Sequence, residues 1–125
     1  GNAVAFGEGY AAAQQSTAGG STTRGIYCGG KAPGFKNNID FITIMTTGNG
    51  TDFGDLTLNR QNGTATATQT RGIYAGGGNP TYYNVIDYIS LTSLGNAQDF
   101  GDLTVWGERN GGQSVSDSHG GIGGF

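Results

Sequence analysis

A motif of two carboxylates, three positions apart, is the first feature of the sequence that suggests chemistry. It occurs twice, as Asp52 with Asp55 and as Asp99 with Asp102. Carboxylates spaced in this way can ligate Ca²⁺ or act as an acid/base pair. The alternative is structural: they accept backbone N–H bonds in a turn and pair with the recurring Arg24 and Arg71. We expect the structural role, because a site needs one catalytic pair whereas a turn device is needed in every repeat.

The single cysteine and the single histidine suggest no nucleophilic site. Cys28 occupies the position that Ala75 fills 47 residues later, so we expect a small buried residue with an idle thiol. His119 lies close to the position equivalent to Arg71 and is interpreted as a terminal variation. One cysteine supplies neither an intramolecular disulfide nor a zinc site. With no Ser–His–Asp pattern, zinc cluster or nucleotide fingerprint, the sequence predicts no enzyme and no cofactor.

The composition predicts an all-β fold. Of 125 residues, 26 are Gly, and each Gly inside a helix costs about 0.5–1 kcal/mol relative to Ala. Gly does not recur at every third position as in collagen, and apolar runs such as 38–44 and 84–91 argue against disorder. The glycines are therefore expected in turns and at close backbone contacts.

Charge and hydropathy exclude two classes of partner. The net charge is −3 and no segment clusters Lys or Arg, which disfavours nucleic-acid binding. No apolar run approaches the roughly 20 residues that cross a bilayer, so no membrane insertion is expected. The chain starts at Gly1, which suggests a processed protein, an excised fragment or part of a longer chain, and the sequence leaves these three open.

An internal repeat of 47 residues is the most informative feature. The segment 48–57 returns at 95–104, and a degenerate copy opens the chain at 1–10. Likewise 24–30 returns at 71–77. We divide the chain into repeat 1 (1–47), repeat 2 (48–94) and a partial repeat 3 (95–125), which together form one β-repeat domain or the terminal part of a larger one.

Strand and turn signals divide each repeat into four short strands. Alternating small and β-branched residues at 64–70, a short buried run at 72–76 and apolar–polar alternation at 85–91 predict three of them. A fourth fits at 99–104, after a Gly-Asn turn. Four short strands in about 47 residues are typical of a β-propeller blade, a four-stranded antiparallel sheet.

The repeat resembles the kelch repeat. The residues that carry the resemblance are an apolar run ending in a Gly pair (73–77), a strand containing an acidic residue (85–88), and an aromatic-containing turn followed by an Arg (53–60). The chain departs from kelch blades in having Asp-Phe where they usually have Trp. The recurring Asp-Phe-Gly-Asp-Leu-Thr and the terminal 118–121 also resemble kelch-like repeats in structural proteins of tailed phages, cyanobacterial phages especially.

Residues kept in every repeat are expected to build the sheets. The Gly pairs end a buried strand, where backbones approach closely and φ can be positive, rather than cradling phosphate. The aromatic that recurs after Asp is expected between neighbouring sheets, and Asp40 and Asp87 are expected to be paired or at an edge. The predicted structural residues are Gly29, Gly30, Gly76, Gly77, Gly123, Gly124, Phe6, Phe53, Phe100, Arg24 and Arg71.

Binding is expected where the repeats differ. Trp106 stands where the earlier repeats have Ala12 and Asn59, and the loops 31–36 and 78–83 also differ. Aromatic side chains there can stack on sugar rings, such as a host-surface glycan, anchor a protein partner, or simply fill a core or interface. The candidate binding residues are Tyr82, Tyr83, Trp106 and Phe125.

The incomplete third repeat predicts assembly. Propellers generally close with four to eight blades, so two and two-thirds repeats leave unpaired edges. We expect a homo-oligomer, a larger parent protein or a complex with other virion or surface proteins, rather than a monomer. The expected function is a non-enzymatic structural and binding module of a phage virion, in a tail, fibre or capsid surface. Alternatives are an extracellular or cell-surface bacterial adhesive or filament protein, and a fragment of a kelch-type copper oxidase.

Overall fold

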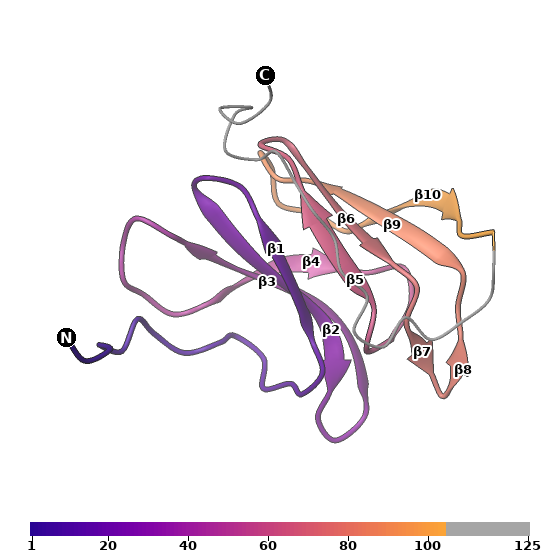
Figure 1. The fold of residues 1–125 in the computed structure, drawn as a ribbon, viewed down its shortest axis with the longest axis horizontal. Coiled ribbons are helices and arrows are strands. Elements are labelled where there is room, and N and C mark those ends of the chain that lie inside the picture. The colour runs from indigo at the N-terminus through magenta and orange to yellow at the C-terminus, as the bar shows by residue number, and fades with distance from the viewer. Residues whose placement is uncertain (105–125) are drawn as a thin grey trace.

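A computed structural model describes residues 1–104 of the chain, and these residues form strands and no helix (Figure 1). Two four-stranded antiparallel sheets and one small two-stranded sheet make up the fold. The prediction of an all-β fold is confirmed. Within residues 1–104 there is accordingly no helix long and apolar enough to cross a membrane.

The first sheet is a meander in which each strand pairs with the next along the chain. Its strands are β1 (Thr17–Gly20), β2 (Arg24–Lys31), β3 (Phe35–Thr43) and β4 (Thr51–Asp55). Alternation in β2 and β3 places Ile26, Cys28 and Ile39 on one face, and the cross-strand neighbours Tyr27 and Asp40 on the other. The sheet therefore has an inner apolar face and an outer mixed face.

The second sheet repeats this meander 47 residues later. Its strands are β5 (Thr64–Ala67), β6 (Arg71–Ala75), β9 (Val85–Ser90) and β10 (Gln98–Asp102), in the order β5-β6-β9-β10. The strand with the Gly pair is second in both sheets, as predicted, although in the second sheet the pair directly follows β6. The loop between β6 and β9 forms the extra hairpin of β7 (Gly78–Asn79) and β8 (Thr81–Tyr82). Each sheet draws its fourth strand from the opening of the next 47-residue unit.

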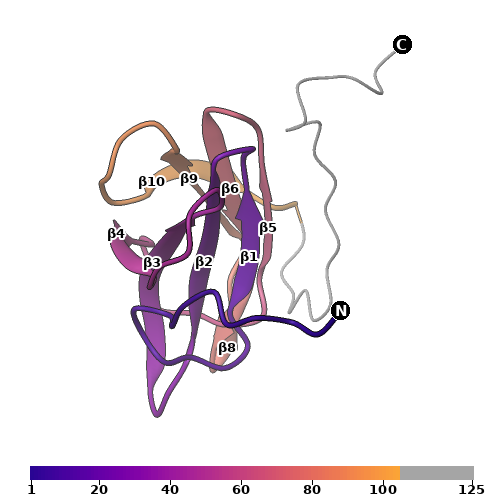
Figure 2. The same ribbon diagram turned by 90° about the vertical axis from the view of Figure 1, so that its left-hand side faces the viewer.

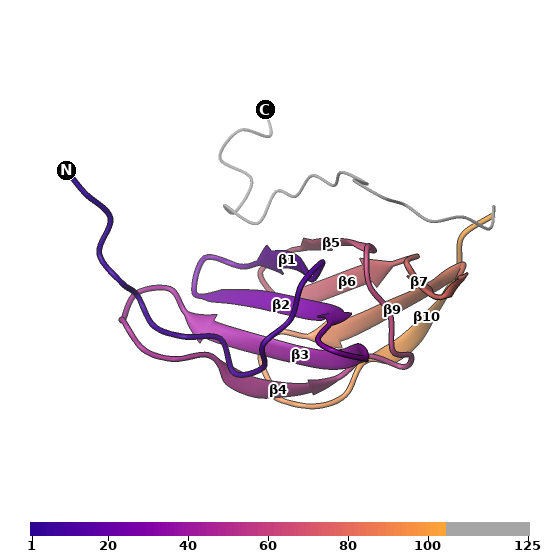
Figure 3. The same ribbon diagram turned by 90° about the horizontal axis from the view of Figure 1, so that it is seen from below.

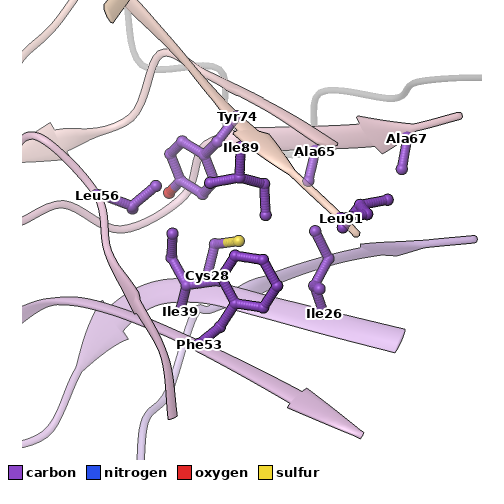
Figure 4. Packing of buried hydrophobic residues seen from close by; sticks show 10 residues of the cluster. All are labelled: Ile26, Cys28, Ile39, Phe53, Leu56, Ala65, Ala67, Tyr74, Ile89 and Leu91. Carbon is purple, nitrogen blue, oxygen red and sulfur yellow. The ribbon is translucent and has the colours of Figure 1, made fainter. Parts of the chain in front are cut away.

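The two sheets pack face to face, with β1 next to β5 (Figure 3). Figure 4 shows the side chains between them. The first sheet contributes Ile26, Cys28, Ile39 and Phe53, which face Tyr74 and Ile89 of the second sheet. The remaining residues of the cluster are Leu56, Ala65, Ala67 and Leu91. Each large apolar side chain buried in this way contributes roughly 1.5–3 kcal/mol. This single intersheet core holds the described fold together.

The segment before β1 crosses the outer face of the first sheet (Figure 2). The backbone N–H groups of Gly48 and Gly50 donate to the carbonyls of Phe6 and Glu8. At the same repeat positions, Gly95 and Ala97 donate to Phe53 and Asp55 of β4. Residues 6–8 thus lie where a preceding β4 would lie, although they form no strand.

Candidate binding site

A buried arginine fills one corner of the interface between the sheets. Arg60 lies in the linker between β4 and β5 and is fully buried. Its Nη2 lies 2.8 Å from Oδ2 of Asp87, which is 1% exposed, in an ion pair. Its Nη1 donates to the carbonyl of Val85 at 3.1 Å, and its guanidinium carbon lies 4.8 Å from the centre of the Tyr74 ring. We call this group, Arg60 with Tyr74 and Asp87, the closed corner.

The linker holds Arg60 by its backbone as well. The N–H of Arg60 donates to the carbonyl of Lys36, and its own carbonyl accepts from Gly30. The next residue, Gln61, exchanges two backbone hydrogen bonds with Gly78, and Asn62 follows with φ of 60°. The backbone of Arg60 is thereby tied to the first sheet while its side chain enters the second.

Every oxygen of the Asp87 carboxylate has a partner. Thr57 donates to it twice, from its backbone N–H to Oδ2 at 2.9 Å and from Oγ1 to Oδ1 at 2.7 Å. The Tyr74 hydroxyl in turn accepts from the N–H of Gly63 at 3.1 Å, and burial raises the pKa of Tyr74 to about 12. A charge buried this deeply is stable only when it is paired and hydrogen-bonded.

The outer face of the first sheet carries the same corner without its arginine. Tyr27 and Asp40 are cross-strand neighbours there, as Tyr74 and Asp87 are in the second sheet. The linker is also repeated, because Gln14 exchanges two backbone hydrogen bonds with Lys31 and Gln15 has φ of 58°. The position equivalent to Arg60 holds Ala13. We call the group of Ala13, Tyr27 and Asp40 the open corner.

The open corner lines a cavity of about 470 Å³. Tyr27 is 44% exposed, against 2% for Tyr74. Asp40 is only 7% exposed; its Oδ2 accepts from the N–H of Ala11 at 2.9 Å, while its Oδ1 is buried with no hydrogen-bond partner among residues 1–104. Burial, and secondarily the charge of Asp52, raise the pKa of Asp40, against the opposing effect of the Ala11 hydrogen bond. The carboxylate is thus poorly satisfied.

The glycine pairs have the backbone role predicted for them. Gly29, Gly30, Gly76 and Gly77 all have φ between 64° and 113°. A Cβ on Gly29 would lie 2.4 Å from the carbonyl oxygen of Arg60 in the linker of the closed corner, and one on Gly30 2.8 Å from that of Gln14 in the linker of the open corner. The pairs therefore let the linkers that carry the two corners approach the strands.

The paired carboxylates do not meet the arginines, so the predicted pairing is wrong. Asp52 and Asp55 lie on β4, and Asp99 and Asp102 on β10. The Arg24 guanidinium instead donates to the carbonyl of Leu91 at 2.6 Å and lies 5.0 Å from the centre of the Phe41 ring. Arg71 lies 5.1 Å from the Tyr88 ring centre. Both arginines lie over an aromatic on the neighbouring strand, because that ring is a diagonal cross-strand neighbour within reach of a long side chain.

The turn role of these carboxylates is seen at one of the four. Asp99 Oδ1 accepts the N–H of Gly101 at 3.0 Å. As for calcium, no three Asp, Glu, His or Cys side chains in residues 1–104 lie together in a way that could hold a metal ion. The described part of the chain offers these carboxylates no third acidic ligand.

The two repeated phenylalanines differ in burial. Phe53 is 3% exposed and packs edge-to-face on Phe41, with ring centres 5.9 Å apart, as predicted. Phe100 is 53% exposed, so its predicted burial is wrong. The second sheet covers Phe53, whereas residues 1–104 contain no further four-stranded sheet to cover Phe100. Phe6 is also partly exposed, at 36%.

Cys28 is a small buried residue, as predicted. It packs in the intersheet core, and burial raises the pKa of its thiol to about 12 (Figure 4). Of the candidate binding aromatics, Tyr82 is exposed on β8, and Tyr83 donates from its hydroxyl to the carbonyl of Asn79 at 3.4 Å. Trp106, His119, Gly123, Gly124 and Phe125 lie outside the described residues.

Sequence reasoning missed the closed corner, although it expected Asp87 to be paired. In the sequence, Arg60 stands out only as the residue that ends the kelch-like turn segment 53–60. The available signal was the contrast between Arg60 and Ala13 at one repeat position, together with the Asp that recurs later in both repeats, as Asp40 and Asp87. Comparison with protein-family models and with curated proteins found no match to this chain.

Proposed function

We propose that the chain is a non-enzymatic structural and binding module, made of propeller-type blades, that assembles with other chains of a phage virion. One observation carries this proposal. The first sheet has an apolar strip that the second sheet covers, and the outer face of the second sheet carries the repeat equivalent of that strip. The buried strip consists of Ile26, Cys28, Ile39, Phe41 and Phe53, and the outer strip of Ile73, Ala75, Ile86, Tyr88 and Phe100. Strand alternation places the outer strip on the face away from the first sheet.

The surface that covers the buried strip shows what would fit the outer one. In the described fold this cover is the inner face of the second sheet, with Tyr74, Ile89 and Leu91 on it. A further sheet of the same repeat, supplied by a partner, presents the same kind of face. Its burial would remove Phe100 and Tyr88 from water, which favours association.

Three further features support a blade-like module. Both sheets are four-stranded meanders that stack face to face with their first strands, β1 and β5, adjacent, as propeller blades stack. The closed corner locks neighbouring sheets together, which suits a rigid assembly. The kelch-like sequence pattern of the repeat agrees with this architecture. The virion setting rests on the resemblance to phage proteins alone.

The alternative of a kelch-type copper oxidase is less well supported. Such a site needs a Tyr/His/Cys ligand set, and the only cysteine is buried between the sheets with a thiol pKa of about 12. A metal binds the thiolate, not the thiol. A bacterial surface adhesive would use the same stacking faces and exposed aromatics, so it differs from our proposal in setting rather than in mechanism.

Native mass spectrometry of the purified chain tests the proposal. We expect an assembly in the wild type, and loss of that assembly in Phe100→Asp, which places a charge on the outer strip. Met45→Asp is the matched control, because Met45 is 79% exposed but lies in the turn after β3, away from the strip. A wild-type chain that stays a folded monomer at micromolar concentration, or an assembly unaffected by Phe100→Asp, would overturn the proposal.

A further inference from the structure

The closed corner shows which chemical group this geometry accommodates. The Arg60 guanidinium makes an ion pair with Asp87, a hydrogen bond to the carbonyl of Val85 and a cation–π contact with Tyr74. A planar guanidinium suits the combination of a carboxylate and an aromatic face better than an ammonium does. The corner is therefore a guanidinium site that the chain fills with its own residue.

The open corner keeps the receiving groups of that site. Tyr27 and Asp40 have the same cross-strand register as Tyr74 and Asp87, and Asn38 stands at the position of Val85. Tyr27, Asn38 and Asp40 all line the 470 Å³ cavity. The arginine itself is replaced by Ala13, which also lines the cavity. A pocket of this volume lies within the usual range for small ligands.

The electrostatics of the cavity select a cation. Asp40 is 93% buried, and its Oδ1 has no hydrogen-bond partner among residues 1–104, a costly state for a carboxylate. Glu8 lines the same cavity, and Asp52 acts on Asp40 from β4. Lys36 also lines the cavity, yet among the described residues no cationic group lies within ion-pair distance of Asp40. An arriving cation would satisfy the buried oxygen.

We infer that the cavity of the open corner binds the guanidinium group of an arginine side chain, held between the Tyr27 ring and the Asp40 carboxylate. This deepens the proposed function, since it names the side chain by which a protein partner engages the outer face of the first sheet. It rests on the proposed function only for the source of that arginine. The pocket itself requires no assembly to bind its ligand.

An NMR titration with N-acetyl-L-arginine N-methylamide tests the pocket directly. We expect saturable shifts of the Tyr27 ring signals, and none with the citrulline analogue, which has the same shape but no charge. The lysine analogue should bind more weakly than the arginine one. Asp40→Asn should weaken arginine binding at least about tenfold, whereas Asp102→Asn, an exposed carboxylate on β10, should leave it unchanged.

A second variant fills the pocket from within. Ala13→Arg should block the probe, because its own guanidinium would occupy the site as Arg60 does in the closed corner. If Ala13→Arg does not fold, the citrulline analogue and Asp40→Asn still decide the question. The absence of saturable binding to the wild type, equal binding of citrulline, or unchanged binding to Asp40→Asn would overturn the inference.

The two proposals fail in different ways. The probe is a small amide, so its binding is read whether or not the protein assembles. A protein that assembles but does not bind arginine would overturn the pocket and leave the proposed function standing. A monomer that binds arginine would overturn the proposed function and leave the pocket standing.

Discussion

The closed and open corners have similar backbones and differ most clearly at one repeat position, which holds Arg60 in the closed corner and Ala13 in the open one. Both have a Tyr–Asp cross-strand pair, a linker that exchanges two backbone hydrogen bonds with the neighbouring strand, and a residue with φ near 60°. In the closed corner Arg60 and the first sheet together make Tyr74 almost inaccessible. In the open corner Ala13 leaves a cavity and a buried oxygen without a partner. The backbone of the repeat thus builds the same Tyr–Asp site twice. The residue at position 13 or 60 decides whether the chain fills that site with its own guanidinium.

The two faces of the second sheet give the same lesson for apolar packing. Phe53 is buried because that sheet's inner face covers it, and Phe100, at the equivalent position, is exposed because nothing in residues 1–104 covers the outer face. Identical sequence motifs therefore have different energetic roles. In a repeat protein the environment of a residue depends on which neighbour is present.

The largest expected effect is the destruction of the closed corner. Arg60→Ala leaves the Asp87 carboxylate buried without its cation and should lower the free energy of unfolding by about 5 kcal/mol. Urea unfolding measures this loss. Arg24→Ala serves as the control, because Arg24 is only partly buried and should cost no more than about 2 kcal/mol. Equal losses in the two variants would show that the corner has no special role.

The paired phenylalanines should respond unequally to truncation. Phe53→Ala removes a buried ring and its edge-to-face contact, at a cost of about 3 kcal/mol. Phe100→Ala should cost less than about 1 kcal/mol in dilute protein, where no partner covers it. Chemical denaturation at low protein concentration compares the two. A loss at Phe100 as large as that at Phe53 would mean that Phe100 is buried within the single chain.

Cys28 provides a smaller test of the intersheet core. Its repeat equivalent is Ala75, and Cys28→Ala should cost about 1 kcal/mol because only the sulfur is removed. In the folded protein a thiol with a pKa of about 12 should react very slowly with a thiol reagent at pH 8, and quickly once urea unfolds the chain. Fast reaction of the native protein would contradict the packing seen in Figure 4.

The pH dependence of stability gives the smallest expected effect. Folding raises the pKa of Asp40 above 3.8, so its contribution is fully present below that pH and is lost as the pH rises through the raised pKa. Relative to Asp40→Asn, which cannot ionise, the wild type should therefore lose stability between pH 3.8 and neutrality. Unfolding free energies of both proteins across this range provide the comparison. Parallel pH profiles would indicate that Asp40 is well solvated or already paired.

Local sequence signals predicted the sheets because the repeat, the strand pattern and the turn residues all indicated the same strands. The 47-residue repeat, the alternation of apolar residues and the Gly pairs all describe features internal to one sheet, and the strands and positive φ angles appear where these signals place them. The partners of Arg24 and Arg71 were predicted wrongly. Charge complementarity suggested aspartates, but the aromatic rings Phe41 and Tyr88 lie closer across the strands. Pairing of side chains depends on register, which composition does not reveal.

The candidate site was harder to predict than the sheets because it depends on contacts between them. Arg60 and Asp87 lie on a linker and a strand that meet only once two sheets stack, so no local pattern links them. The burial of Phe53 without that of Phe100 has the same cause, since both have the same sequence neighbours. Comparing positions 13 and 60 across the repeats points to the corner, because each of them is close in the fold to a Tyr–Asp pair that both repeats contain.

The equivalence of the two corners is the central claim, and a double-mutant cycle tests it most directly. Ala13→Arg should raise the free energy of unfolding by about 1–2 kcal/mol in the wild-type background, because its guanidinium can pair with the buried Asp40 Oδ1. The same substitution should give no gain when Asp40→Asn is also present. A gain of the same size in both backgrounds, or no gain in either, would contradict the account, because the open corner would then not be a guanidinium site.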